Sequence, residues 1–170
     1  MLRVAPMSPG EAAAAQVVEA ARRAGLTVAC GESLTGGALC SAMVAVPGAS
    51  AVVRGGVIAY HRDLKSSVLG VDPALIDRHG VVSEPVAMAM AAGVRERMGA
   101  TLGVGTTGVA GPDPHEGVAP GTACVAVVGA GAEASRTIAA KGSRDAIRAA
   151  AVAAALALLA DAIAAASAQR

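Results

Sequence analysis

The absence of large aromatic side chains is the feature that most limits how this chain can fold. The sequence of 170 residues has no Phe and no Trp, and Tyr60 is its only Tyr. A core without these rings must be built from Ala, Val, Leu, Ile and Met, so helices and strands must pack closely to fill it. The length fits one domain and is ample for such a core. We expect a single domain over residues 1–170, with residues 1–8 flexible.

The order of the predicted elements indicates the fold class. Short apolar runs typical of buried strands alternate with helical segments, which predicts an α/β layered fold. Two late strands around Gly129-Ala130-Gly131 are predicted to pair as a hairpin, so the sheet is expected to be mixed. The expected strands cover residues 26–30, 51–60, 100–106, 122–128 and 135–140. The expected helices begin near residues 9, 38, 63, 73, 84 and 144, four of them after the capping residues Ser8, Asp72, Ser83 and Ser143.

Composition and charge argue against several classes of protein. A net charge of +1 gives no electrostatic basis for binding nucleic acid or an anionic membrane surface. The three Cys and three His lack the spacing of metal ligands, so we expect no metal site and no cofactor. Residues 1–10 lack the apolar stretch of a signal peptide, and the most hydrophobic run, residues 149–160, is too short to span a bilayer. We therefore expect a cytoplasmic enzyme or binding domain without nucleic-acid or membrane partners.

The lone tyrosine lies five residues before one of only two lysines, Lys65, in a chain with twelve arginines. A buried ammonium can lose its proton, whereas a guanidinium cannot, and a phenol places a hydroxyl on a rigid ring. The segment Tyr60–Lys65 is therefore a candidate active-site segment. The alternative is that Tyr60 is a half-buried strand residue and Lys65 a solvated helix residue.

Two glycine-rich loops follow two of the predicted strands. In the first, residues 31–37, Ser33 lies at a strand-to-helix turn where a nucleophile can project, and Thr35 is expected to cap the following helix. The second runs from Thr106 through Gly108 and Gly111 towards residue 122. Because ligands gather at the carboxyl ends of strands in α/β sheets, both loops are candidates to line one pocket. Neither loop has a dinucleotide-binding or P-loop fingerprint, and Ser, Thr and Gly are also common in ordinary caps and turns.

A series of motifs in these segments resembles the C-terminal domain of the CinA (competence/damage-inducible) family, the nicotinamide-nucleotide amidases. The resemblance runs in order over nearly the whole chain. The matching stretches are residues 32–37 (ESLTGG), 46–50 (VPGAS), 55–60 (GGVIAY) with Lys65, 69–71 (LGV), 80–84 (GVVSE), 107–112 (TGVAGP) and 120–122 (PGT), with Arg144 and Arg148 at the start of the last helix.

The resemblance implies a fold, an activity and self-association. The implied fold is a three-layer α/β/α domain with a mixed sheet. The implied activity is hydrolysis of the carboxamide of nicotinamide mononucleotide to nicotinate mononucleotide and ammonia, in pyridine nucleotide salvage. The implied assembly is a homo-oligomer, a dimer or higher. Many family members carry an additional N-terminal domain, and this sequence resembles the stand-alone form.

Amide hydrolysis requires a nucleophile, a base and an oxyanion site. Ser33 is the predicted nucleophile and Lys65 its base, which requires that burial or nearby positive charge lower the lysine pKa from about 10.4. Tyr60 is predicted to relay the proton or to align Ser33 with Lys65. Thr35 is the alternative nucleophile, because the sequence does not show which hydroxyl faces Lys65.

Other residues are expected to bind the substrate. The backbone N–H groups of residues 35–37 are the predicted oxyanion hole, and the Arg144 guanidinium suits a phosphate. The predicted substrate-binding residues are Glu32, Thr35, Gly36, Gly37, Thr107, Gly108, Ala110, Gly111 and Arg144.

The sequence departs from the family pattern at several positions expected to lie at the pocket rim. Leu34 stands in place of the usual Cys, and residues 61–62, 113–115 and 119 also differ. The changed segment 113–119 leaves the substrate open. Two alternatives therefore stand beside the leading hypothesis: a non-catalytic nucleotide-binding module, and an amidase or esterase acting on a different small substrate.

Overall fold

The structure is a computed structural model that describes residues 8–168. Residues 1–7, which belong to the segment expected to be flexible, lie outside the described residues. The described part forms a single α/β domain built on a five-stranded sheet. Its strands are β1 (Val28–Glu32), β2 (Val53–Ile58), β3 (Leu102–Gly108), β4 (Thr122–Gly129) and β5 (Ala132–Ala139).

The sheet is mixed, as the sequence predicted. Its strand order is β2-β1-β3-β4-β5. Strand β1 pairs in parallel with β2 and β3, whereas β4 and β5 form the predicted antiparallel hairpin next to β3. The carboxyl ends of the three parallel strands therefore meet at one edge of the sheet, where the two glycine-rich loops begin.

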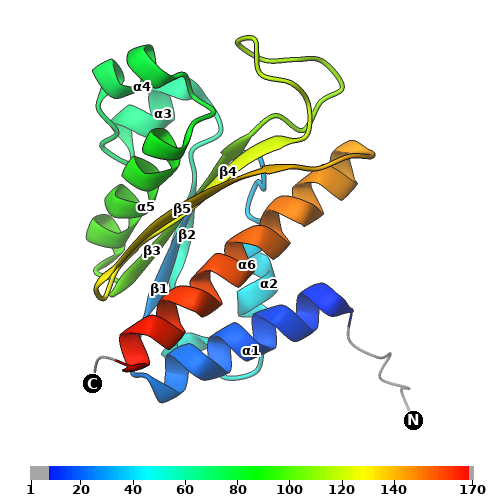
Figure 1. Ribbon diagram of the computed structural model, residues 1–170. Coiled ribbons are helices and arrows are strands. Elements are labelled where there is room, and N and C mark those ends of the chain that lie inside the picture. The colour runs from blue at the N-terminus through cyan, green and yellow to red at the C-terminus, as the bar shows by residue number, and fades with distance from the viewer. Residues whose placement is uncertain (1–7, 169–170) are drawn as a thin grey trace.

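Helices cover both faces of the sheet and complete the three-layer α/β/α arrangement (Figure 1). Helices α1 (Pro9–Arg23), α2 (Ala38–Val44) and α6 (Arg144–Ala168) cover one face. Helix α5 (Glu84–Met98) covers the other, together with α3 (Arg62–Ser67) and α4 (Pro73–His79), and a short 3-10 helix spans Ala49–Ala51. The predicted caps are present: Ser8 forms a capping box with Glu11, and Asp72, Ser83 and Ser143 accept from first-turn amides.

Small side chains fill the core, as a chain without Phe and Trp requires. Between the sheet and helices α1, α2 and α6 the buried residues are Ala, Val, Leu, Ile, Met and Cys. On the opposite face α5 lies directly over glycines: a Cβ placed on Gly105 would be 2.0 Å from the Ala87 carbonyl oxygen, and one on Gly103 would be 1.9 Å from that of Ala91. Close approach of helix and sheet thus replaces bulky side chains.

Strand β1 begins and ends later than predicted. The sequence suggested residues 26–30, with Gly31 and Glu32 already in the loop, but both residues pair with β2 and β3. Strand β3 similarly continues to Gly108, two residues further than predicted. Glycine and charged residues weaken a strand pattern in sequence, yet ladder pairing on both sides of β1 holds them in extended conformation.

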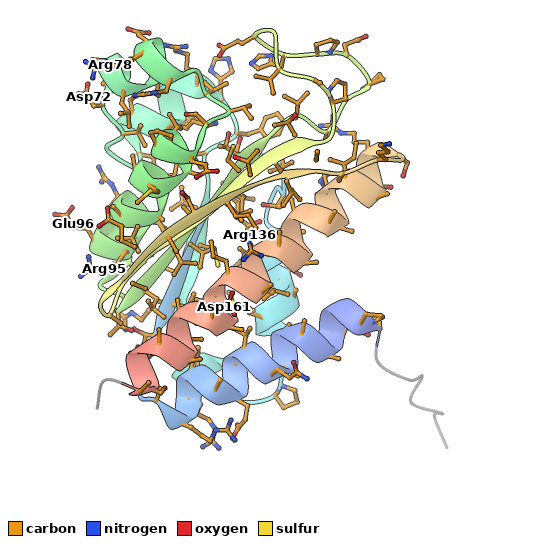
Figure 2. The ribbon with its side chains drawn as sticks, in the orientation of Figure 1. Asp72, Arg78, Arg95, Glu96, Arg136 and Asp161 are labelled. Carbon is orange, nitrogen blue, oxygen red and sulfur yellow. The ribbon has the colours of Figure 1, made fainter. Side chains whose placement is uncertain are left out.

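The last helix is longer than the apolar run that the sequence singled out. With 25 residues, α6 is the one helix among residues 8–168 that is long and apolar enough, by length and composition, to cross a membrane. The core helix of a globular domain meets the same criterion. Here Leu156, Leu159 and Ile163 are buried in the core that α6 shares with α1 and the sheet. On the outer side, Arg136 of β5 and Asp161 of α6 point toward one another and form an ion pair at 3.8 Å (Figure 2).

Candidate active site

Ser33 lies directly after β1, at the turn that leads into α2. Its amide donates to the Thr106 carbonyl of β3 at 3.0 Å, and its carbonyl accepts from the Gly36 amide at 3.0 Å, which closes a tight turn. The residue is 7% exposed. The residue predicted as nucleophile is therefore held by its backbone at the carboxyl edge of the sheet, on a turn whose position β1 and β3 fix.

Lys65 meets Ser33 from the neighbouring segment. It lies in α3, which follows β2, and the residue is 2% exposed. Its Nζ is 3.0 Å from Ser33 Oγ, 2.9 Å from the Ala59 carbonyl oxygen and 3.3 Å from the Tyr60 carbonyl oxygen. In the neutral amine the two N–H bonds can donate to the two carbonyls, which turns the nitrogen lone pair toward the serine hydroxyl.

Burial tunes the proton affinity of this lysine. Removal from water disfavours the ammonium form and lowers the Lys65 pKa from its ordinary value of 10.5 to about 8, while the Glu116 carboxylate acts in the opposite direction. Glu116 is carried by the loop between β3 and β4; it accepts from the Val81 amide and pairs with Arg62 at 3.5 Å. The neutral amine of Lys65 is therefore reached at a lower pH than that of an ordinary lysine.

Tyr60 does not take the position predicted for it. Its phenol hydroxyl accepts from the Arg144 guanidinium at 2.9 Å, and no hydrogen bond joins it to Ser33 or Lys65 in the described chain. Only its backbone carbonyl contacts Lys65. Tyr60 is 58% exposed. Arg144 also donates to the Gly111 carbonyl at 2.8 Å, so Tyr60, Arg144 and Gly111 form one group at the rim.

Glu32, a predicted substrate-binding residue, has a structural role instead. Its carboxylate is buried and accepts from the amides of Gly37, Leu39 and Cys40 at 2.8–3.1 Å. It thereby caps α2, the function that the sequence suggested for Thr35. Glu32 is the last residue of β1, which ends two residues later than predicted, and it is buried.

The hydroxyls of Thr35 and Thr107 also face the interior. Thr35 Oγ1 lies 2.7 Å from Thr106 Oγ1 and the residue is fully buried, while Thr107 Oγ1 donates to the Val81 carbonyl. Of the two hydroxyls that the sequence left as alternatives, the one that contacts Lys65 is therefore that of Ser33. Neither threonine side chain is placed to bind a substrate.

The amides predicted as the oxyanion hole are largely engaged within the protein. Gly36 donates to the Ser33 carbonyl and Gly37 to Glu32. In the described part of the chain no hydrogen bond is formed by the amides of Leu34 and Thr35, the two that directly follow Ser33. The amides available as oxyanion donors on this turn are thus those of Leu34 and Thr35, and that of Leu34 has the place directly after the serine that is usual on a strand-to-helix turn.

Sequence reasoning gave no role to Arg148, although it noted the residue. From α6 its Nε donates to the Leu34 carbonyl at 3.0 Å and its terminal nitrogen to the Thr35 carbonyl at 2.9 Å. The available signal was a second arginine one helical turn after Arg144, on the apolar side of the last helix. The guanidinium thus ties the Ser33 turn to α6.

The second glycine-rich loop packs against the first. A Cβ on Gly108 would lie 2.8 Å from Leu34 Cδ1, and Ala110 joins Leu34 in a small buried cluster with Ile147 of α6. Leu34 therefore belongs to the core beneath the site and not to the pocket rim, where it was expected. Residues 113–116 are exposed, as a rim requires.

Metal ligands do not gather in the described residues. No group of three or more His, Cys, Asp or Glu side chains within residues 8–168 is arranged to hold a metal ion. The fold and the site together define a three-layer α/β/α domain with a buried serine–lysine pair at the carboxyl ends of its parallel strands.

The sequence model of the CinA C-terminal domain matches residues 10–163, and the chain belongs to this family. A CinA-like protein of Frankia casuarinae is 47% identical over 133 residues, which are 78% of this chain and 31% of that protein. A putative competence-damage inducible protein of Geobacillus kaustophilus is 43% identical over 134 residues, 78% of this chain and 32% of that protein. The chain thus spans about a third of the length of these curated relatives.

Solved structures share the whole fold. The crystal structure of a CinA superfamily protein from Klebsiella pneumoniae superimposes with a TM-score of 0.89 at 28% identity, covering 92% of this chain and 99% of that one. A competence/damage inducible protein from Agrobacterium tumefaciens gives a TM-score of 0.87 at 30% identity, covering 95% and 99%. These matches confirm the predicted fold class and family.

Proposed function

We propose that the chain hydrolyses the carboxamide of nicotinamide mononucleotide to nicotinate mononucleotide and ammonia, with Ser33 as nucleophile and Lys65 as general base. The observation that carries the proposal is the buried contact of 3.0 Å between Lys65 Nζ and Ser33 Oγ. A lysine with a lowered pKa beside a serine is the arrangement of a Ser–Lys hydrolase. The resemblance to nicotinamide-nucleotide amidases supplies the substrate.

The arrangement of Lys65, Ser33 and the two free amides supports the following reaction. Neutral Lys65 takes the proton of Ser33 as Oγ attacks the carboxamide carbon, and the amides of Leu34 and Thr35 donate to the oxygen that becomes negative. The lysine ammonium then gives this proton to the departing nitrogen, so ammonia leaves and an acyl-serine remains. Water, deprotonated by Lys65, attacks the acyl carbon, and the returned proton restores Ser33 as the acid is released.

Arg144, with its partners Tyr60 and Gly111 at the rim of the site, is the proposed binding site for the phosphate. Arg144 lies on the surface at the start of α6, with Tyr60 and the Gly111 carbonyl as its partners. A guanidinium has five N–H donors, and two contacts leave others for a phosphate oxygen. In this role Tyr60 holds Arg144 in place, which replaces the proton relay expected from the sequence.

The test is release of ammonia from nicotinamide mononucleotide by the purified protein. Ser33→Ala and Lys65→Met should each lower kcat by roughly a thousandfold or more, as loss of a nucleophile or its base does. Thr35→Ser, which keeps the buried hydroxyl, is the matched control and should retain activity. Full turnover in both Ser33→Ala and Lys65→Met would refute the mechanism.

The same assay separates the two alternatives. Saturable binding of the nucleotide without turnover would favour a non-catalytic binding module. Turnover of other carboxamides or esters, but not of nicotinamide mononucleotide, would favour a different substrate, which the exposed loop residues 113–116 would then help to select.

A further inference from the structure

The guanidinium of Arg148 bridges two consecutive carbonyls of the turn that carries Ser33. Its Nε and one terminal nitrogen donate to Leu34 and Thr35 at 3.0 and 2.9 Å. It also packs on Gly36, since a Cβ at that position would lie 3.4 Å from its terminal nitrogen. Its remaining ionic contact is with Asp145, an exposed residue one turn earlier on α6, at 3.6 Å.

Because the peptide unit is planar, the contacts of Arg148 with these carbonyls also determine where the N–H groups of the next residues point. The carbonyl of one residue and the amide of the next belong to one planar trans unit and point in opposite directions. A guanidinium bound to the Leu34 carbonyl therefore fixes the Thr35 N–H on the side of the turn away from Arg148. Because the Gly36 amide closes the turn onto the Ser33 carbonyl, Thr35 is the third residue of the turn. In turns of this kind the N–H of the third residue lies on the same side as the side chain of the first.

The positive charge of Arg148 also makes the N–H group a stronger hydrogen-bond donor. A carbonyl that accepts a hydrogen bond from a cation polarises its peptide unit, so the attached N–H becomes a better donor. The Thr35 amide, which forms no hydrogen bond in the described chain, receives this effect through the Leu34 carbonyl. The Thr35 carbonyl passes the same effect to the Gly36 amide, and so strengthens the bond that closes the turn.

We propose that Arg148 is a positioning residue that aims and polarises the Thr35 amide toward the oxyanion formed at Ser33. This inference rests on the proposed serine–lysine hydrolysis and extends it by a residue that touches no reacting atom. It predicts that loss of Arg148 lowers the rate of the chemical step and leaves substrate binding almost unchanged, because substrate contacts lie at the Arg144 rim.

Three variants test the proposal. Arg148→Met removes charge and both hydrogen bonds, Arg148→Lys keeps charge but cannot bridge two carbonyls, and Arg148→Ala leaves space for added guanidinium ion. Arg136→Met is the matched control, since Arg136 also ties α6 to a neighbouring element, through Asp161, but lies on β5. Thermal midpoints of all variants are compared first, so that kinetic changes can be read on folded protein.

Two readouts are used, one of which does not depend on the natural substrate. The first is kcat and KM for nicotinamide mononucleotide. The second is the rate at which an alkyl fluorophosphonate forms an adduct on Ser33, followed by mass spectrometry; the serine oxygen displaces fluoride at phosphorus, and the phosphoryl oxygen occupies the oxyanion position.

We expect Arg148→Met to lower kcat and the phosphonylation rate about 10- to 100-fold, somewhat less than loss of a whole oxyanion donor. KM should stay within about threefold. Arg148→Lys should lie between Arg148→Met and the unaltered protein, added guanidinium should restore part of the Arg148→Ala rate, and Arg136→Met should match the unaltered protein.

Two results would overturn the inference in distinguishable ways. If the unaltered protein is phosphonylated at Ser33 but Arg148→Met reacts as fast, or if the loss appears in KM and not in kcat, the role of Arg148 is wrong and the hydrolase stands. If the unaltered protein neither hydrolyses the nucleotide nor forms the adduct, the proposed function fails and this inference fails with it.

Discussion

At the scale of single residues, the burial of Lys65 links pH to rate. Neutral lysine is the active form, so kcat/KM should rise with pH through a midpoint near 8, the pKa that burial gives Lys65, and level off at higher pH. Glu116→Gln should move the midpoint to lower pH, because the Glu116 carboxylate favours the ammonium form. The measurement is the pH profile of ammonia release. Asp113→Asn, on the same exposed loop, is the control, and an unmoved midpoint in Glu116→Gln would contradict the argument.

The same burial links pH to stability. Between pH 8 and 10.5 the unfolded chain binds a proton at Lys65 that the folded protein does not, so the contribution of Lys65 to the free energy of unfolding rises with pH over this window. Lys65→Met lacks that contribution. Its stability relative to the unaltered protein should therefore fall by about 3 kcal/mol between pH about 7 and about 11. Urea unfolding of both proteins at several pH values measures this, and a pH-independent difference would disprove it.

The residues of the site divide into those that sequence can assign and those that it cannot. The sequence could pair Ser33 with Lys65, which lie 3.0 Å apart in the structure, because a serine after a strand and a rare lysine stand out as residue types. Glu32, Thr35 and Thr107 were placed at the substrate because the sequence shows a polar group but not the direction in which it points. Arg148 contacts carbonyls more than a hundred residues away in sequence, and such long-range partners leave no local pattern.

At the scale of elements, α5 packs on β3 through glycine. Gly105→Ala would place a methyl group 2.0 Å from the Ala87 carbonyl oxygen and 2.9 Å from the Ala91 amide nitrogen, so helix and strand must separate. We expect a loss of roughly 3 kcal/mol or more, or failure to fold, as overpacking against backbone causes. The measurement is the free energy of unfolding in urea.

Gly10 in helix α1 provides the matched control. No atom lies within 4 Å of a Cβ placed there, and Gly10→Ala should stabilise the protein by roughly 0.5–1 kcal/mol, because alanine favours the helix. No cost at Gly105, or an equal cost at Gly10 and Gly105, would contradict the close backbone contact between α5 and β3 as the cause.

Most elements were predictable because their signals are local. Caps at Ser8, Asp72, Ser83 and Ser143 mark helix starts, and Ala130-Gly131, both with positive φ, form a hairpin turn of a kind that sequence reveals. The ends of β1 and β3 were misplaced by two residues, since pairing with neighbouring strands determines where a strand stops. Sequence shows propensity, but a ladder can extend through Gly31 and Glu32 against it.

At the scale of the whole molecule, we propose that the protein self-associates, as the family resemblance implies. Among the described residues the exposed large apolar side chains are Val44, Ile58 and Tyr60, on α2 and on or just beyond the edge strand β2. If this edge forms the contact, Val44→Lys should shift the molar mass measured by light scattering toward that of a monomer, while Val44→Ala should not. A monomeric mass for the unaltered protein would reject the proposal.

The absence of Trp also determines the fluorescence of the protein. Tyr60 is the only tyrosine, so the ultraviolet fluorescence of the whole protein comes from a single ring at the rim of the site. Its hydroxyl contacts the guanidinium assigned to the phosphate, and there is no indole to take up its excitation. A nucleotide that engages Arg144 should therefore change the emission without any introduced label. The lack of Phe and Trp that requires close packing in the core thus also allows nucleotide binding to be followed by the fluorescence of Tyr60.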